Sequence, residues 1–305
     1  MKNQEFQIIG LDIGRGYVKA YSEFENMVKQ CIFKSVVGLG RSMNFENYTD
    51  PIYIEVNGED YFAGILAENE ADNPIQNLKD DKTSVVSKKL LYAALNKIAV
   101  CENVKLMIGV PNKLFRKSVL LEIQKEYKDT SIKIKDKITG AYKNVNIIDV
   151  SIYREADAAL LWHVRKCSGF NNNLCMVTVG FRTTEICTYD NNMKFNDKLS
   201  KSIELGNKTA LEYVQRKLKD DDIMKELNEI DSSDRYDKYK KIAYNNLSEK
   251  ISQEIEGLLI NLKEYDVFIG GGTALNMNFD EYDVIPDAQM ATSKGLFTVG
   301  NKVFK

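Results

Sequence analysis

The sequence has few of the residues that carry metal-binding and redox chemistry. Among 305 residues there is one His (His163) and there are five Cys, none of them in a CxxC pair. A structural zinc site needs four nitrogen or sulfur ligands at close spacing, so the sequence argues against one. An odd number of scattered cysteines favours a reducing compartment, where each serves as a small apolar residue. We therefore expect a cytoplasmic protein.

Long apolar runs and a large net charge are also missing. No stretch approaches about 18 consecutive apolar residues, so we expect no transmembrane helix. The start, MKNQEFQIIGLDIG, contains no apolar run of signal-peptide length. The 42 Lys and Arg against 44 Asp and Glu give a net charge of −2, which provides no general attraction for nucleic acid or membrane. We expect neither to be bound directly.

What the chain does contain is enough apolar residue for a core. Hydrophobic residues make up 44% and Pro only 4 residues, which excludes a disordered or collagen-like chain. At roughly 150 residues per domain, the length suggests two domains or two lobes of one.

Strand and helix patterns alternate along the sequence. Residues 6–13 and 17–21 are apolar runs joined by a tight turn, which predicts a hairpin. Asn57-Gly58 between 52–56 and 61–63 predicts a second hairpin. Buried strands are expected over 104–110, 174–179, 184–189 and 266–269, and helices over 83–100, 112–128, 155–166, 208–219, 234–262 and 288–300. Ile132, Ile134 and Ile138 alternate with lysines, which favours a strand with one solvated face over a nucleic-acid stripe.

The second half repeats the opening pattern. CMVTVGFRTTEICTY, like IIGLDIGRGYVKAY, is a buried strand, a turn of small residues and a second strand. The repeat suggests two similar lobes. We place lobe I at 1–152, lobe II at 153–287, and a C-terminal helix that returns to lobe I at 288–305.

Three glycine turns follow strands, and such turns cradle phosphates through backbone N–H groups, although a plain hairpin turn is the better explanation of any one of them alone. They are Gly14-Arg15-Gly16, Gly180-Phe181-Arg182-Thr183-Thr184 and Gly270-Gly271-Gly272-Thr273. No GxxxxGK[ST] occurs, and no GxGxxG opens a βαβ unit, so a P-loop and a dinucleotide fold are disfavoured.

Three charged residues near these turns suit phosphate chemistry. Asp12 at a strand end can hold Mg²⁺ through water, and Lys19 can reach a phosphate oxygen. Glu155 at a helix start can orient a water molecule toward a phosphate. The simpler alternatives are a turn-capping acid, a solvated strand lysine and an acid favoured by the helix dipole.

The motifs DIGRGYVK, EADAA, TVGFRTTE, IGGGT and ATSKGL occur in the order found in actin, DnaK-type chaperones and sugar kinases. With the Asn-Gly hairpin, the chain most resembles prokaryotic actin-like proteins of the ParM and archaeal group. The resemblance implies an α/β, actin-like (ribonuclease H-like) two-lobed fold with the nucleotide in the interlobe cleft.

The resemblance also implies a site. Asp12 would face magnesium through water, Lys19 would contact the phosphates and Glu155 would position the attacking water. The nucleotide would be bordered by Gly14, Arg15 and Gly16 at the first turn, by Gly180, Phe181, Arg182 and Thr183 at the second, and by Gly270, Gly271, Gly272 and Thr273 near the adenosine.

One position departs from the family pattern. The usual Asp-x-Gly of the second phosphate loop is Thr178-Val179-Gly180 here, and Glu185 occupies the position of the later family acid. A neutral hydroxyl cannot replace the pull of a carboxylate on hydrated Mg²⁺. We therefore hypothesise altered metal binding or hydrolysis, with nucleotide binding retained.

The function implied is an ATPase that forms nucleotide-dependent filaments and segregates plasmid DNA through a DNA-binding adaptor. The cofactors would be ATP/ADP and Mg²⁺, with GTP not excluded. One alternative is a non-polymerising, nucleotide-gated scaffold. Another is a small-molecule kinase of the same superfamily, although no strand-end aspartate in an acceptor-like motif stands out.

Overall fold

The computed structural model describes residues 5–304, and by its internal contacts the chain divides into two compact units. Unit 1 comprises the residues up to Ala158 together with those from Thr292 onward, and unit 2 spans Ala159–Ala291. The first boundary lies within helix α4 (Glu155–Val164).

A ten-stranded sheet forms unit 1, in the order β3-β2-β1-β8-β10-β9-β5-β6-β4-β7. Its first five strands in this order are β3 (Met27–Lys34), β2 (Tyr17–Phe24), β1 (Gln7–Ile13), β8 (Asn103–Val110) and β10 (Tyr142–Arg154). The central strand β1 pairs antiparallel with β2 and parallel with β8, and all its residues are buried. The first predicted hairpin is thus confirmed.

The other half of this sheet contains the second predicted hairpin. Its strands are β9 (Thr130–Asp136), β5 (Ile52–Val56), β6 (Glu59–Ala63), β4 (Val36–Leu39) and β7 (Ile75–Gln76). Asn57 and Gly58 have φ values of 54° and 81°, as a two-residue turn of primed type requires. Antiparallel pairing of β5 with β6 confirms the prediction.

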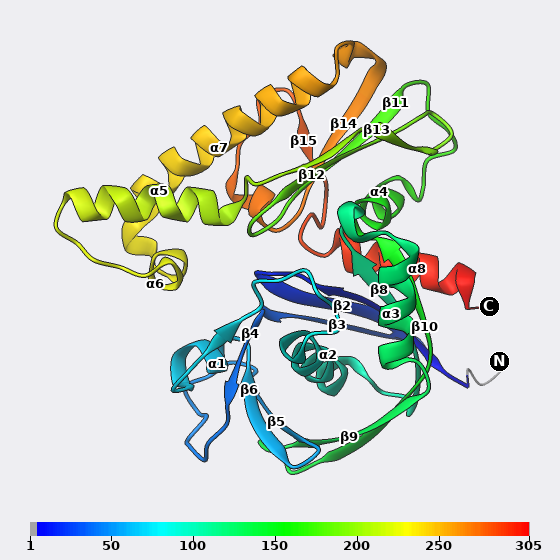
Figure 1. Cartoon of the computed structure of the whole chain (residues 1–305), viewed down its shortest axis with the longest axis vertical. Helices are drawn as coiled ribbons and strands as arrows, with labels where there is room; N and C mark the ends of the chain where they lie inside the picture. The colour runs from blue at the N-terminus through cyan, green and yellow to red at the C-terminus, as the bar shows by residue number, and fades with distance from the viewer. Residues whose placement is uncertain (1–4, 305) are drawn as a thin grey trace. The chain divides into compact units, whose positions relative to one another are not determined.

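The sheet of unit 1 curls around helix α2 (Val85–Ile98), as Figure 1 shows. Leu90, Leu91 and Leu95 of α2 are fully buried in the core that the strands line. The Ser84 hydroxyl caps the helix by accepting from the Ser87 N–H at 3.2 Å. The remaining helices of the unit are α1 (Ile65–Glu70), α3 (Lys117–Tyr127) and α8 (Ala291–Val303).

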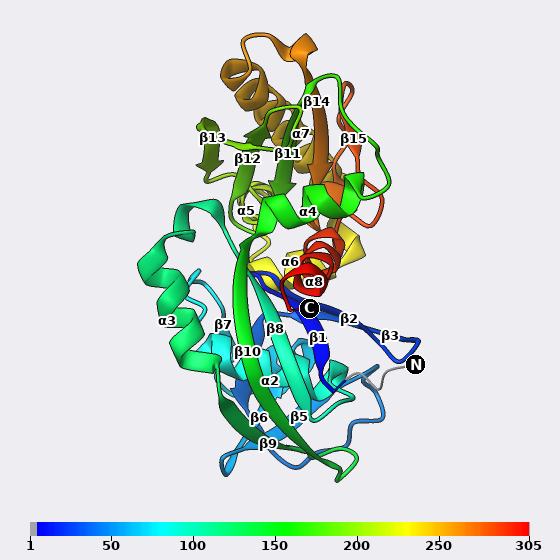
Figure 2. The same cartoon turned by 90° about the vertical axis from the view of Figure 1, so that its right-hand side faces the viewer.

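Helix α8 lies beside β1 in Figure 2, and two glycines permit this close packing. A Cβ on Gly10 would collide with the Ser293 carbonyl oxygen, and one on Gly295 with that of Ala158. Ala158 belongs to the EADAA motif, so Gly295 lets α8 approach the backbone of that motif at the start of α4.

Unit 2 contains a five-stranded sheet in the order β13-β12-β11-β14-β15. The strands are β11 (Asn173–Val179), β12 (Thr184–Tyr189), β13 (Phe195–Ile203), β14 (Tyr265–Gly270) and β15 (Asp283–Val284). Strand β11 pairs antiparallel with β12 and parallel with β14, as β1 does with β2 and β8. The repeat seen in the sequence is therefore a repeat of strand pairing.

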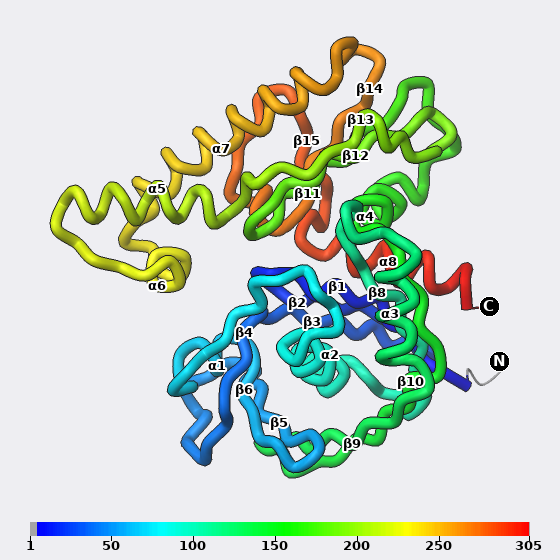
Figure 3. The backbone as a smooth tube through the Cα atoms, viewed as in Figure 1, coloured from blue at the N-terminus to red at the C-terminus, as the bar shows by residue number. Residues whose placement is uncertain are grey.

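Helices α5 (Asn207–Asp220), α6 (Leu227–Ser232) and α7 (Asp237–Leu258) pack together within unit 2, as the tube of Figure 3 shows. The Tyr244 hydroxyl of α7 donates to the Asn207 side-chain oxygen of α5 at 2.7 Å. No helix within residues 5–304 has the length and apolar character needed to cross a bilayer.

Several predicted boundaries are wrong. The helix expected over 234–262 starts as a 3-10 turn, capped by Ser233, and α7 ends at Leu258. The helix expected over 112–128 is broken at Phe115 into a 3-10 turn and α3, and α8 begins at Ala291 rather than at 288. Ile138 lies outside β9 and is 37% exposed.

Candidate functional site

The first glycine turn links β1 to β2, and protein donors take up its carbonyl groups. Gly14 N–H closes the turn by donating to the Tyr17 carbonyl at 3.1 Å. The other contacts are Lys82 Nζ to Ile13 O (2.7 Å), Ser35 Oγ and Asn77 Nδ2 to Gly14 O (2.7 and 3.3 Å), and Ser35 N to Gly16 O (2.9 Å). The N–H groups of Arg15 and Gly16 have no acceptor among the described residues. They are thus left for an anion.

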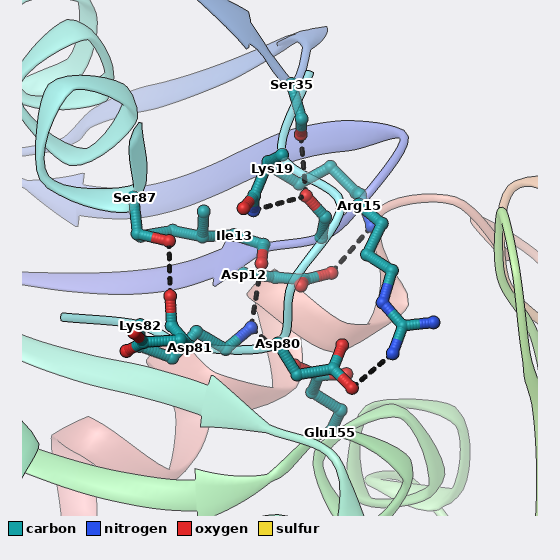
Figure 4. Close-up of polar contacts among 12 residues, drawn as sticks. Asp12, Ile13, Arg15, Lys19, Ser35, Asp80, Asp81, Lys82, Ser87 and Glu155 are labelled. Atoms are coloured by element: carbon teal, nitrogen blue, oxygen red, sulfur yellow. Dashed lines mark hydrogen bonds and ion pairs between the residues drawn. The ribbon is translucent and has the colours of Figure 1, made fainter. Parts of the chain in front are cut away.

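Two ion pairs lie beside this turn (Figure 4). Lys19 Nζ lies 2.6 Å from Asp12 Oδ2, and Lys82 Nζ lies 3.1 Å from Glu155 Oε1. The structure thus brings together the three charged residues predicted from the sequence and adds Lys82, which the sequence analysis missed.

Burial and charge act in opposite directions on the second pair. Burial lowers the pKa of Lys82, but the attraction of Glu155 and Asp12 outweighs it, so the pKa lies above its ordinary value. Burial raises the pKa of Glu155 even though Lys82 opposes this. Each group is therefore the main electrostatic partner of the other.

The predicted phosphate-loop residue Arg15 is held by a second missed residue, Asp80. Arg15 Nη2 forms an ion pair with Asp80, whose carboxylate also lies 2.9 Å from Lys113 Nζ. Burial would raise the pKa of Asp80, but Lys113 and Arg15 hold it below its ordinary value. The Arg15 Nε and Nη1 atoms are buried and donate to no group among residues 5–304. Buried donors of this kind are expected to meet an anionic ligand.

The second glycine turn, between β11 and β12, repeats this scheme. Gly180 N–H donates to the Thr183 carbonyl at 3.0 Å. The turn carbonyls accept from Asn207 N and Thr273 Oγ1 (Gly180 O, 3.1 and 2.9 Å) and from Lys208 N (Phe181 O, 2.7 Å). In the part of the chain that the structure describes, no acceptor takes the N–H of Phe181 or Arg182. The Arg182 side chain points to Glu204, 3.0 Å away on the surface.

The third glycine turn packs against the second. Gly271 has φ 92°, and a Cβ there would collide with the Val179 carbonyl oxygen, so only glycine fits. Its N–H donates to Ala288 O at 3.0 Å. With the Thr273 contact, the structure gathers the second and third turns in unit 2.

Strand register places a carboxylate opposite Thr178. In unit 1, Asp12 and Lys19 are opposite each other across β1 and β2; in unit 2, Thr178 and Glu185 hold the same relation across β11 and β12. Glu185 is 5% exposed. Directly opposed residues share one face of an antiparallel pair. The carboxylate missing from β11 is therefore present on the adjacent strand.

The predicted site residues thus fall into two groups, one in each unit. The residues that the sequence analysis missed, Ser35, Asn77, Asp80 and Lys82, all reach the first turn from other segments. The one local signal was the charged run Lys79-Asp80-Asp81-Lys82 ahead of the helix cap Ser84.

Comparison with known proteins shows what this chain is similar to. Residues 10–156 match the family model described as actin like proteins N terminal domain. No curated protein sequence matches the chain at a significant level.

Solved structures match over nearly the whole chain. The archaeal actin homologue Ta0583 has 17% identity and a TM-score of 0.82, over 97% of this chain and 100% of that one. A ParM in a 15-stranded filament from Clostridium botulinum has 18% identity and a TM-score of 0.82, over 98% and 100%. Bacillus thuringiensis ParM with ATP has 13% identity and a TM-score of 0.72, over 98% and 99%.

The fold is therefore actin-like. The family match and these structures confirm the resemblance to prokaryotic actin-like proteins that the ordered motifs indicated.

Proposed function

We propose that the chain is an actin-like ATPase that assembles into filaments in a nucleotide-dependent way. The observation that carries the proposal is the common hydrogen-bond scheme of the two phosphate turns. In each, a glycine N–H closes the turn, protein donors occupy the carbonyls, and the next two N–H groups face no acceptor within residues 5–304. Such N–H groups bind phosphate oxygens.

The residues of unit 1 fit a triphosphate with magnesium. The buried free donors of Arg15 and the ammonium of Lys19 suit phosphate oxygens. Residues 5–304 contain no group of three Asp, Glu, His or Cys side chains that would hold a metal by themselves. Mg²⁺ commonly binds through phosphates and water, with Asp12 facing it through water. Bound magnesium would neutralise charge that develops on the phosphates, and Glu155 would orient the attacking water.

Similar structures support nucleotide binding and filament assembly in the proposed function. A crystal structure of Ta0583 contains ADP, and a structure of Bacillus thuringiensis ParM contains ATP, which favours an adenine nucleotide over GTP. The Clostridium botulinum ParM forms a filament. We extend both properties to this chain, and plasmid segregation with them. The net charge of −2 gives the chain no general attraction for DNA, which supports DNA contact through an adaptor protein.

Light scattering and sedimentation with magnesium and ATP test the proposal. Scattering should rise above a critical protein concentration with ATP and fall as ADP accumulates. Glu155→Gln is the matched variant: it should bind ATP and assemble, but its filaments should persist because hydrolysis is slow.

Scattering that stays flat with every nucleotide and salt would contradict filament formation. ATP binding without assembly would instead support the nucleotide-gated scaffold. Phosphate transfer in a panel of sugars would support the kinase.

A further inference from the structure

The segment before α2, residues 76–82, contacts the first turn at several points, and we call it the brace. Its contacts are Gln76 Nε2 to Arg15 O (3.5 Å), Asn77 Nδ2 to Gly14 O (3.3 Å), Asp80 with the Arg15 guanidinium, and Lys82 Nζ to Ile13 O (2.7 Å). Of these residues, only Lys82 also contacts Glu155. It is therefore the link between the turn and the acid.

The Lys82 ammonium is buried in unit 1. Its side chain is only 3% exposed, and such a charge is stable there only with close partners. An ammonium has three N–H donors, and the acceptors it has are Ile13 O and Glu155 Oε1. Within residues 5–304 no acceptor takes the third donor. This donor is left for water or a ligand.

Other charges also act on Glu155. Asp12 of β1 acts on it as a like charge, and Lys19 of β2, which is paired with Asp12, acts on it as an opposite charge weaker than that of Lys82. Asp80 adds attraction for Lys82. The ion pair uses Oε1 of Glu155, and no described protein donor bonds to Oε2. One carboxylate oxygen is thus fixed while the other is available.

We propose that Lys82 is a positioning residue, which fixes the Glu155 carboxylate to the first turn so that Glu155 can orient the attacking water. The inference rests on the proposed function, because it assigns a role in the same hydrolysis. A purely structural lysine would affect folding and leave the chemical step unchanged.

The test compares Lys82→Met, Glu155→Gln and the double variant in three assays: single-turnover ATP hydrolysis with magnesium, affinity for a fluorescent ATP analogue, and thermal unfolding without nucleotide. Lys88→Met is the matched control, since Lys88 pairs with Glu126 at 2.6 Å, away from the turn. We expect Lys82→Met to slow hydrolysis about 100-fold, with affinity changed less than about threefold.

The rate losses of Lys82→Met and Glu155→Gln should not multiply in the double variant if Lys82 acts by positioning Glu155. On the Glu155→Gln background, loss of Lys82 should lower the rate less than about twofold, because the acid it positions is already gone. Without nucleotide, the double variant should melt at a higher temperature than Lys82→Met, since it leaves no unpaired buried carboxylate. Lys88→Met should keep the parental rate.

If Lys82→Met hydrolyses ATP at the parental rate, the inference is overturned and the proposed function stands. The same holds if the rate losses of the two single variants multiply in the double variant. If the parent hydrolyses no nucleoside triphosphate, the proposed function fails and the positioning role fails with it.

Discussion

The glycine turns after β1 and β11 have the same backbone hydrogen-bond scheme, but different groups hold them in place. Around the first turn, most supports are side chains from distant segments, among them the charged Asp80 and Lys82, and the Asp12–Lys19 ion pair lies on the two strands that the turn joins. Around the second, the supports are backbone N–H groups of Asn207 and Lys208 and the Thr273 hydroxyl.

The backbone geometry of such a turn is therefore separable from the charged side chains around it. Backbone and hydroxyl donors suffice to present two N–H groups, as the second turn shows. The charged network of unit 1 is therefore not needed to shape its turn. Under the proposed function, unit 1 supplies most of the charged groups for hydrolysis, and the turn of unit 2 supplies N–H groups for binding.

The largest expected effect is at the backbone contact that holds the second turn. Gly271→Ala combines φ 92° with a collision against Val179 O, so we expect a loss of about 3–5 kcal/mol in the free energy of unfolding. Urea denaturation measures it. Gly58→Ala is the control, with φ 81° in open space, and should cost about 1–2 kcal/mol. Equal costs for the two would show that the contact is unimportant.

Next comes the acid–lysine pair of the first turn. Asp12→Asn leaves Lys19, 16% exposed, without its counter-charge, and we expect a loss of about 2–4 kcal/mol in the free energy of unfolding. Denaturation with and without magnesium and ATP measures it. The exposed pair of Arg182 and Glu204 in unit 2 is the comparison: Glu204→Gln should cost less than about 1 kcal/mol. A small loss in both would remove the distinction between the turns.

Copying the first pair into unit 2 sharpens the comparison. Thr178→Asp sets a carboxylate opposite Glu185, so we expect about 0.5–1 kcal/mol of destabilisation and a changed rate of phosphate release. Adding Glu185→Lys reproduces the Asp12–Lys19 arrangement and should restore part of the stability. Identical phosphate release in Thr178→Asp and the parent would refute the link between Thr178 and hydrolysis.

Because of the Asp80 carboxylate in unit 1, we expect the stability difference between Asp80→Asn and the parent to depend on pH. Its pKa is lowered in the folded state, so its contribution to stability is present above its ordinary pKa and is lost as pH falls through the folded value. Asp80→Asn should cost about 1 kcal/mol at neutral pH and nothing at the acid limit. Unfolding curves from pH 7 to below about pH 4 test this. A constant difference between variant and parent would contradict it.

The smallest effects come from two equivalent hydroxyls. Ser35 donates to Gly14 O and Thr273 to Gly180 O, and each carbonyl also accepts a second hydrogen bond. Ser35→Ala and Thr273→Val should each lower the free energy of unfolding by about 1 kcal/mol. Clearly unequal losses would show that the two turns do not share one hydrogen-bond scheme.

Local signals in the sequence predicted the parts of the fold that depend on neighbouring residues. The Asn57-Gly58 turn and the buried strand ending at Ile13 are examples. Strands β3 and β13 escaped prediction because they are largely solvated edge strands without a buried alternation. Observed helix ends differed from the predicted ones where a capping residue, such as Ser233, begins a 3-10 turn in place of the α-helix that the periodicity alone would predict.

The site was predictable only in part. The glycine turns and the acids Asp12 and Glu155 stand in motifs, so the sequence indicates them. Lys82 acts on Ile13 and Glu155, which are 69 and 73 residues away in the chain, and no local pattern encodes such contacts. They exist only after the brace has folded against β1.

The central claim is that, in each turn, the two N–H groups without an acceptor within residues 5–304 bind phosphate. Amide resonances of Arg15, Gly16, Phe181 and Arg182, followed by NMR during titration with ATP and magnesium under non-assembling conditions, test it most directly. We predict that all four resonances shift during the titration. Resonances that stay unchanged at either turn at saturating nucleotide would contradict the account.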